Sequence, residues 1–284
     1  MNLPNLHGKL FIVTGANIGL GLQTTKNLCA AGATVAMACR NQQKAQAAAA
    51  EIVAAQPDAK IEHVRLDLSD YTSVRAAAAD ILARFSHIDG LVNNAGLFFD
   101  KHSLNGAGHE MTIATNHLGP FLLTNLLLDR LKATPGARIV NVASEAHRMG
   151  KVKPDDLHAD QGLVGWNVYG TSKLCNILFT QALATRLAGS GVTVTCCHPG
   201  FVASNFGETN KTLMDRIVGW SKVFAISPQK GAQTQTWLAA SPDVAGKSGG
   251  YYANCKEKKP SKAGRDAALA EQLWAVSVGQ VGLG

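Results

Sequence analysis

Short apolar runs alternate with helix-length segments along the chain. Residues 10–13 (Leu-Phe-Ile-Val) form the first run, and a helical pattern follows from about residue 19 to residue 31. Several runs are apolar at every position, which is typical of strands that helices cover on both faces of a sheet. The pattern predicts an α/β fold with a single doubly wound parallel sheet and helices on both faces. Further strands are expected at residues 34–39, 61–66, 88–93, 138–142, 192–197 and 250–253, and a terminal helix at about 265–276.

The composition fits one hydrophobic core. The chain has 284 residues, of which 46% are hydrophobic and 17% are charged. This is enough apolar material for a large core, and it excludes an intrinsically disordered chain. No internal repeat or Pro/Ser-rich linker divides the predicted strands and helices, so we expect residues 1–284 to form one domain.

The sequence also indicates where the protein works. Its longest apolar stretch, residues 120–128, is interrupted by Thr124 and Asn125. A membrane helix needs about 20 apolar residues, so no stable membrane insertion is expected. The first residues lack the basic and apolar regions of a signal peptide. We therefore expect a cytoplasmic protein.

Charge and cysteine content exclude other classes. The six cysteines are too scattered for a disulfide scaffold, and no Cys/His spacing predicts a metal site. A net charge of +7 is compatible with nucleic acid or an anionic small molecule as partner. The only dense basic run is residues 256–262, which a solvated surface explains better. We expect no metal and no nucleic acid partner.

A glycine-rich turn joins the first predicted strand to the first predicted helix. Residues 14–21 read Thr-Gly-Ala-Asn-Ile-Gly-Leu-Gly, with the spacing TGxxxGxG. Free backbone N–H groups and the helix dipole attract phosphate at this position. The turn predicts a dinucleotide site, although a purely structural turn would also use glycines. The residues expected to form the site are Gly15, Asn17, Ile18, Gly19 and Gly21.

The end of the second predicted strand indicates which dinucleotide is bound. An acidic residue there binds the ribose 2′-hydroxyl of NAD, whereas an arginine accommodates the 2′-phosphate of NADP. This strand ends in Cys39 and Arg40, without an acid. A guanidinium offers paired, charge-assisted donors to a phosphate, so we expect NADP(H) as the cofactor. A surface arginine without this role is the alternative.

Tyr169 and Lys173 lie four residues apart in a helical segment, which puts the phenol and the ammonium on one face. A tyrosine with its usual pKa of about 10 is a poor base at neutral pH. A neighbouring cation that favours the phenolate gives such a tyrosine a catalytic role. The YxxxK spacing alone is common by chance, but together with the phosphate-binding turn it is a strong indication of catalysis.

The sequence resembles the short-chain dehydrogenase/reductase family over nearly its whole length, and this resemblance implies a Rossmann-like fold. Segments 115–124, 172–176 and 198–200 are most similar to the retinol-dehydrogenase-like branch. Protochlorophyllide reductases share much of this pattern and are the nearest competitor. The resemblance rests on the turn at 14–21 and on Asp67, Leu68, Asn93, Asn94, Ala95, Gly96, Asn116, Ser144, Tyr169, Lys173, Pro199 and Gly200.

The resemblance implies catalytic roles for four residues. Tyr169 would be the general acid in carbonyl reduction and the base in alcohol oxidation. Lys173 would lower the pKa of Tyr169 and bind the nicotinamide ribose hydroxyls. Ser144 would hydrogen-bond the substrate oxygen and stabilise developing charge. Asn116 would hold a water that links Lys173 to solvent, although a polar residue that bends a helix is an alternative.

The resemblance also implies cofactor contacts near the strand ends. Asp67, followed by Leu68, would contact the adenine, although an Asp that opens the following turn is almost as good an explanation. Asn93 and Gly96, with Ala95 between them, would support the cofactor's central strand and a ribose contact.

The segment after the sixth predicted strand would pass the nicotinamide. Pro199 and Gly200 would begin it, and the Val202 backbone would contact the carboxamide. Ser204 would lie near the phosphates, where threonine is commoner in the family.

Apolar residues predict the kind of substrate. Residues 205–226 contain apolar positions at helical spacing and are expected to form a lid, although a helix packed on the body would show the same pattern. Phe98, Phe99, Phe206 and Trp220 would add an apolar wall, which favours a small apolar carbonyl or alcohol as substrate.

Three further side chains are expected to take no direct part in catalysis. His147 and His198 have no metal-ligand spacing and are interpreted as structural or pocket-lining. Cys175 is expected in the core rather than as a proton donor.

The leading hypothesis is therefore an NADP(H)-dependent oxidoreductase that interconverts an apolar aldehyde or ketone and its alcohol. A light-dependent protochlorophyllide-type reductase is the enzymatic alternative. A non-catalytic NADPH-binding regulator is the alternative outside enzymes, and the set Asn116, Ser144, Tyr169 and Lys173 argues against it. The long stretch 145–168 leaves the oligomeric state open.

Overall fold

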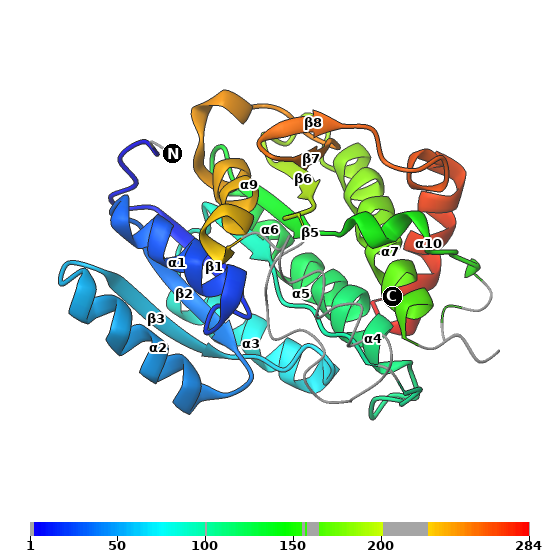
Figure 1. Cartoon of the computed structure of the whole chain (residues 1–284), viewed down its shortest axis with the longest axis horizontal. Helices are drawn as coiled ribbons and strands as arrows, with labels where there is room; N and C mark the ends of the chain where they lie inside the picture. The colour runs from blue at the N-terminus through cyan, green and yellow to red at the C-terminus, as the bar shows by residue number, and fades with distance from the viewer. Residues whose placement is uncertain (1–2, 100, 155–156, 158–164, 201–226, 284) are drawn as a thin grey trace.

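One eight-stranded sheet organises the molecule (Figure 1). The computed structural model describes residues 3–99, 101–154, 157, 165–200 and 227–283. The strand order is β3-β2-β1-β4-β5-β6-β7-β8, with every pair parallel except β7 and β8. The strands are β1 (Leu10–Thr14), β2 (Thr34–Cys39), β3 (Lys60–Arg65), β4 (Gly90–Asn93), β5 (Arg138–Val142), β6 (Thr193–Cys197), β7 (Tyr251–Ala253) and β8 (Lys256–Lys258).

The predicted α/β sheet is confirmed, with one addition at its edge. Strands β2 and β5 have the predicted bounds, and the other predicted strands are present with ends shifted by one or two residues. Strand β8 was not predicted, and its antiparallel pairing with β7 makes the sheet mostly rather than wholly parallel. It lies in the basic run, and all three of its residues are exposed, as expected of a solvated surface.

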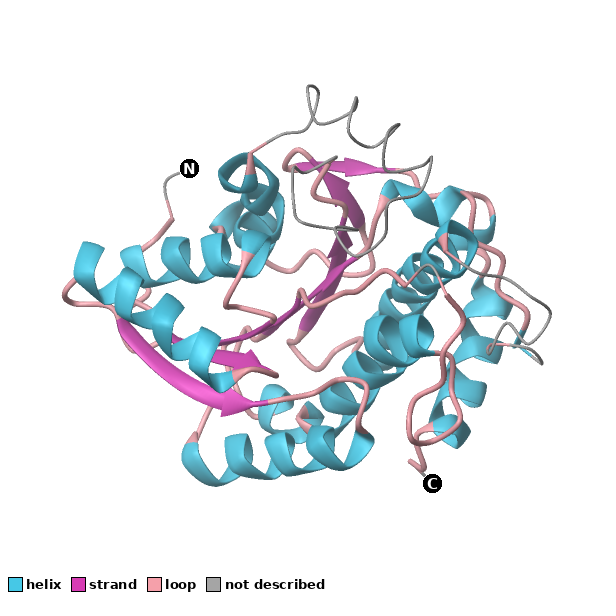
Figure 2. Ribbon diagram, turned by 60° about the horizontal axis from the view of Figure 1, so that its bottom comes forward, coloured by secondary structure: helices cyan, strands magenta, loops and turns pink. Residues whose placement is uncertain are grey.

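Helices cover both faces of the sheet (Figure 2). Alternate residues of β1 point to opposite faces, so that Ile12 packs in the core with α3, α5 and α7, whereas Val13 packs with α1, α2 and α9. None of the helices in the described part of the chain is long and apolar enough to cross a bilayer. The longer helices are α1 (Gly19–Ala30), α2 (Gln42–Ala55), α3 (Tyr71–Arg84), α5 (Gly119–Leu126), α7 (Trp166–Arg186), α9 (Pro228–Ala240) and α10 (Ala267–Gln280).

Shorter helical segments connect these elements. Helix α10 packs against α7 through a separate apolar cluster that includes Leu273, Leu174 and Leu178. The short segments are α4 (Met111–Ile113), a π-helical turn (Ala114–Leu118), α6 (Leu128–Lys132), and 3₁₀ turns at Glu145–Arg148, Pro242–Val244 and Ala263–Arg265.

A buried row of polar side chains ties the centre of the sheet to α5 and α7. The Asn93 amide on β4 donates to Thr124 Oγ1 at 3.0 Å and to Asn141 Oδ1 on β5 at 2.8 Å. Asn141 in turn donates to Thr180 Oγ1 on α7 at 2.9 Å. Because buried polar groups cost free energy unless they are paired, this row fixes the position of α7 on the sheet.

Replacing Asn141 should therefore destabilise the fold. Asn141→Ala removes one hydrogen-bond partner each from the buried Asn93 amide and the buried Thr180 hydroxyl, which is expected to lower the free energy of unfolding by about 1 to 3 kcal/mol. Urea denaturation followed by circular dichroism measures the change. The matched control is Asn167→Ala on the exposed side of α7, which should change stability by less than about 0.5 kcal/mol. Equal effects of the two substitutions would contradict the proposed importance of the buried row.

Candidate active site

The turn between β1 and α1 contains glycines at positions where a side chain would be strained or would clash. Gly15 has a φ of 64°, in the left-handed region. A Cβ atom on Gly21 would lie 2.2 Å from the Gly15 carbonyl oxygen and 2.6 Å from Asn94 Nδ2. These contacts bring the first turn of α1 directly against the strand ends.

The amino terminus of α1 is built to receive an anion. The residue before the helix, Ile18, provides no side-chain cap for the first N–H groups, and the first turn contains no acidic residue. Gly19 has no neighbouring heavy atom within 4 Å of the place where its Cβ would be, and Asn17 is half-buried beside it. Uncapped N–H groups and the helix dipole together suit a phosphate group, so the turn fits a dinucleotide.

Strand β2 brings Arg40 to the same edge of the sheet. The Gly15 N–H donates to the carbonyl oxygen of Ala38 on β2 at 2.9 Å, and this ties the turn to the second strand. Arg40 follows directly and is exposed, and Asn41 then caps α2 by accepting from the Lys44 N–H at 2.9 Å. Arg40 is therefore exposed at the edge of the sheet that carries the glycine-rich turn, because β2 pairs in parallel with β1.

The segment after β4 holds the turn from the other side. Thr14 Oγ1 accepts from the backbone N–H groups of Asn94 and Ala95, both at 3.0 Å. The Asn94 amide donates to the Thr14 carbonyl oxygen at 2.9 Å and accepts from Gln235 at 3.1 Å. Sequence reasoning did not include Thr14 or Asn94 among the site residues, although both belong to the motifs that it recognised. Their role is in packing, which a motif alone does not reveal.

Two predicted cofactor residues make side-chain hydrogen bonds within the protein. The Asn93 amide is buried in the polar row described above. Asp67 Oδ1 accepts from the Ser69 N–H at 3.0 Å and the Ser69 hydroxyl at 2.7 Å, which is the turn-opening role considered as its alternative. Leu68 is buried, and its carbonyl oxygen would lie 2.2 Å from a Cβ on Gly119.

Asn116 is held in the π-helical turn before α5. Its Oδ1 accepts from the Leu97 N–H at 2.7 Å, and its Nδ2 donates to the Leu97 carbonyl at 2.9 Å and to Ser172 Oγ at 3.0 Å. A Cβ on Gly96 would lie 3.0 Å from Lys173 Nζ and 3.5 Å from Asn116 Oδ1. The structure thus brings Gly96, Asn116 and Lys173 together.

Lys173 is buried beneath the site. Its Nζ donates to the Val142 carbonyl at 3.1 Å and lies 5.5 Å from the centroid of the Tyr169 ring. Burial lowers the pKa of Lys173 to about 8, because an apolar environment disfavours the charged form. The lysine is therefore placed beside Tyr169 on the same face of α7.

Tyr169 and Ser144 meet at the carboxyl end of β5. Ser144 begins the Glu145–Arg148 turn and its Oγ accepts from the Ala146 N–H at 3.2 Å. Burial raises the pKa of Tyr169 to about 12, and the hydrogen bond with Ser144 acts in the opposite direction. The sequence argument gave this opposing role to Lys173. The structure differs because Lys173 Nζ contacts the Val142 carbonyl and is itself disfavoured as a cation by burial.

An aromatic cluster flanks the tyrosine. The Phe98 ring lies 5.0 Å from Trp166 and 6.0 Å from Tyr169, measured between ring centroids. Trp166, one helical turn before Tyr169, was not among the predicted wall residues, although its i, i+3 spacing to Tyr169 could have revealed it. Cys175 lies fully buried in the α7–α10 cluster, where burial raises its pKa, so its predicted place in the core is confirmed.

The segment after β6 approaches the same edge. His198, Pro199 and Gly200 are half-buried, and the Gly200 N–H donates to His198 Nδ1 at 3.0 Å. The predicted contacts of Val202 and Ser204, the lid at 205–226 and the wall residues Phe206 and Trp220 lie outside the described residues. Within the described residues, no cluster of three or more His, Cys, Asp or Glu side chains could hold a metal ion.

Comparison with known proteins identifies the family. The family described as short chain dehydrogenase matches residues 9–214. The chain is a short-chain dehydrogenase. This family membership agrees with the resemblance seen in the motifs, and it makes the protein an oxidoreductase of the NAD(P)(H)-dependent type.

Relatives of this short-chain dehydrogenase include retinol dehydrogenases. Mouse retinol dehydrogenase 11 is 42% identical over 282 residues, which cover 98% of this chain and 88% of that protein. Human retinol dehydrogenase 14 is 40% identical, with 98% and 88% covered. The crystal structure of an uncharacterized protein from Mycobacterium paratuberculosis superimposes with a TM-score of 0.81 at 33% identity, covering 99% of this chain and 96% of that one.

The packing of Gly21 generates a prediction for this short-chain dehydrogenase. Gly21→Ala places a methyl group against Gly15 and Asn94, so the turn must shift and nucleotide affinity should fall at least 10-fold. Gly19→Ala is an informative comparison, because that methyl group meets open space but has to adopt a φ of 57°. Isothermal titration with NADPH measures both. Unchanged affinity in Gly21→Ala would show that the turn tolerates displacement and does not hold the nucleotide.

Proposed function

We propose that this protein is an NADP(H)-dependent oxidoreductase that interconverts an apolar aldehyde or ketone and its alcohol. The observation that carries the proposal is the meeting of Tyr169, Ser144 and Lys173 at one end of the sheet, with Tyr169 hydrogen-bonded to Ser144 and Lys173 Nζ 5.5 Å from its ring. The cytoplasmic location expected from the sequence stays a prediction.

The protein's own groups would manage the proton. A bound nicotinamide would supply or accept the hydride. Tyr169 would give its hydroxyl proton to the carbonyl oxygen in reduction and take it back in oxidation, while Ser144 would hydrogen-bond the same oxygen. Because burial raises the pKa of Tyr169 to about 12, its hydroxyl keeps its proton at neutral pH and can donate it in reduction.

Lys173 and Asn116 would support this transfer. The Lys173 ammonium, beside the Tyr169 ring and close to Gly96, would bind the nicotinamide ribose hydroxyls. Asn116 fixes the Leu97 backbone and Ser172 next to the lysine, which keeps that side of the site ordered. The proposed water-holding role of Asn116 would connect Lys173 to solvent.

Arg40 supports the choice of NADP(H). Arg40 is exposed after β2, where an acidic residue would repel the 2′-phosphate. Strand β2 pairs in parallel with β1, so Arg40 follows at the edge of the sheet where the uncapped N–H groups of α1 fit the phosphates. Arginine binds phosphate through paired hydrogen bonds, which supports discrimination between the two nucleotides.

The aromatic cluster supports an apolar substrate. Phe98 and Trp166 present rings beside Tyr169, so a carbonyl next to them would have apolar surface around it. The names of the relatives make retinaldehyde a suitable first probe, to be compared with short aldehydes and aromatic ketones. A panel of these carbonyls, with NADPH and NADH in parallel, tests the proposed activity, and absence of turnover would favour the regulator hypothesis. A light-dependent reductase would instead require illumination with its pigment.

Removing the Arg40 guanidinium tests the cofactor. Arg40→Ala should weaken NADPH binding by roughly 10- to 150-fold, because hydrogen bonds to a charged group contribute about 1.5 to 3 kcal/mol. NADH binding should be nearly unchanged. Fluorescence titration with each nucleotide gives both dissociation constants, with Lys44→Ala on α2 as the control for general loss of positive charge. Equal weakening of NADPH and NADH by Arg40→Ala would remove the 2′-phosphate assignment.

Removing the Tyr169 hydroxyl tests the chemistry. Tyr169→Phe should lower turnover by about 10² to 10⁴, since this is the contribution of a positioned proton donor, while NADPH affinity stays within a few-fold. In the unmodified protein the oxidation rate at saturating cofactor should rise with pH, because oxidation needs the deprotonated form of a tyrosine whose pKa is raised. Steady-state rates between pH 6 and pH 10 check both expectations. Tyr252→Phe is the control, and near-normal turnover in Tyr169→Phe would assign the proton to another group.

A further inference from the structure

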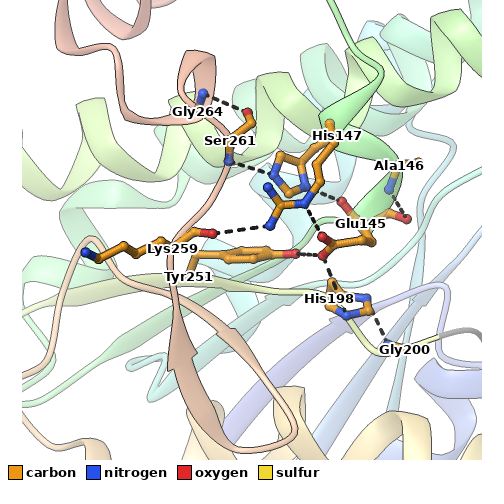
Figure 3. A network of polar contacts seen from close by, with 11 residues as sticks. Glu145, Ala146, His147, His198, Gly200, Tyr251, Lys259, Ser261 and Gly264 are labelled. Atoms are coloured by element: carbon orange, nitrogen blue, oxygen red, sulfur yellow. Dashed lines mark hydrogen bonds and ion pairs between the residues drawn. The ribbon is translucent and has the colours of Figure 1, made fainter.

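A cluster of polar side chains next to Ser144 takes no part in the chemistry proposed above (Figure 3). Glu145 and His147 come from the turn after β5, His198 follows β6, and Tyr251 begins β7. The Glu145 carboxylate accepts from the Tyr251 hydroxyl at 3.0 Å and pairs with the Arg148 guanidinium. The cluster therefore connects three neighbouring strand ends at the edge of the sheet that carries Ser144.

His198 has its hydrogen-bonding state fixed by its neighbours. Its Nδ1 accepts from the Gly200 N–H at 3.0 Å, so this nitrogen has to be unprotonated. The proton of the neutral ring is then on Nε2, which faces Glu145 Oε2 at 3.9 Å. The ring also stacks on Tyr251, with 6.4 Å between centroids and an angle of 21°. Glu145 and Tyr251 thus orient the ring, and the ring holds the Gly200 backbone.

The other half of the cluster holds the Ser144 backbone in a similar way. His147 Nδ1 lies 2.7 Å from the Ser144 carbonyl oxygen, to which it donates, and its Nε2 then accepts from the Ser261 N–H at 3.1 Å. Glu145 is the residue after Ser144. The same short turn therefore fixes the catalytic serine on one side and orients His198 on the other.

We propose that His198 is a positioning residue for the cofactor, which holds the Pro199–Gly200 turn in place through the hydrogen bond from Gly200 to Nδ1. The inference rests on the proposed function, because that turn is the segment expected to pass the nicotinamide. Gly200 has a φ of 90°, a conformation that other residues rarely adopt, so a local acceptor that stabilises it lowers the cost of holding the turn ready.

The positioning role has a pH signature. Protonation of His198 would place an N–H on Nδ1 opposite the Gly200 N–H and break the hydrogen bond. The groups that face the ring are Glu145, His147, Arg148 and Tyr251. Burial lowers the pKa of His198 below its usual 6.5, and the negative charge of Glu145 acts in the opposite direction. The neutral, turn-holding form is therefore present at neutral pH and is lost as the pH falls through this lowered pKa.

Two substitutions of His198 distinguish the effect of its hydrogen-bond acceptor from the effect of its ring. Asparagine at position 198 can accept from the N–H two residues later through its side-chain oxygen, as in an Asx turn, and it does not titrate. Leucine has a comparable size but no acceptor. His198→Asn should therefore bind nucleotide as the parent does at pH 8, whereas His198→Leu should bind roughly 2- to 10-fold more weakly, the effect of losing one neutral hydrogen bond.

The experiment is a fluorescence titration of the parent, His198→Asn and His198→Leu with NADPH and with NADH, at pH 8 and pH 5. The 2′-phosphate of NADPH itself titrates near pH 6, so the ratio of parent to His198→Asn at each pH cancels that effect. At pH 5 we expect the parent to bind nucleotide more weakly than His198→Asn does. The ratio of their two dissociation constants should change by the same factor for NADPH and for NADH. Circular dichroism confirms that each variant is folded, and His7→Asn, at an exposed position, is the histidine control.

The outcomes distinguish the inference from the proposed function. If the parent binds nucleotide and His198→Leu binds equally well, or if His198→Asn is as weak as His198→Leu, the positioning role is overturned while the cofactor proposal stands. If the parent binds NADPH no more tightly than NADH but the effects of the His198 substitutions are present, only the Arg40 assignment fails. If the parent binds neither nucleotide, the proposed function and this inference fall together.

Discussion

The site depends on the burial of α7. A helix buried on most of its surface has to satisfy its polar side chains within the protein, because unpaired buried groups cost free energy. Lys173 and Asn176 both donate to the carbonyl oxygen of Val142, at 3.1 and 3.2 Å. Thr180 accepts a hydrogen bond from Asn141, the residue before Val142 on β5. These bonds fix the rotation of α7 about its axis, and with it the direction in which Tyr169 faces Ser144.

The same demand for buried partners arranges the nucleotide end of the site. Thr14, Asn94 and Gln235 come from three elements that are far apart in the sequence, and their hydrogen bonds surround the glycines of the β1–α1 turn. Both halves of the site are therefore supported by polar groups beneath the surface. The groups at the surface, Arg40 and the α1 amino terminus, are left available for a ligand.

Much of this arrangement could be predicted from sequence, and the exceptions have physical causes. Strands β2 and β5 are mostly apolar and mostly buried, and their ends were predicted without error. Strand β8 reads Lys-Glu-Lys, which is not a sequence pattern typical of a strand. It pairs with β7 through a two-residue hairpin loop in which Asn254 and Cys255 have φ of 51° and 55°. Asp67 and Asn93 were predicted to contact the cofactor because a motif shows only which residue types occur at its positions. Which hydrogen bonds these side chains make inside the protein becomes visible only in three dimensions.

The two edges of the sheet bear on how the molecule behaves in a crowded solution. An edge strand offers unpaired backbone groups to which another chain can add, and lysine on such a strand hinders the approach. At one edge, Lys256 and Lys258 flank Glu257 on the exposed strand β8, and at the other, Lys60 and Arg65 are exposed at the two ends of β3. The positive charge that first suggested an anionic partner is thus placed in part where it keeps the sheets of two molecules from joining.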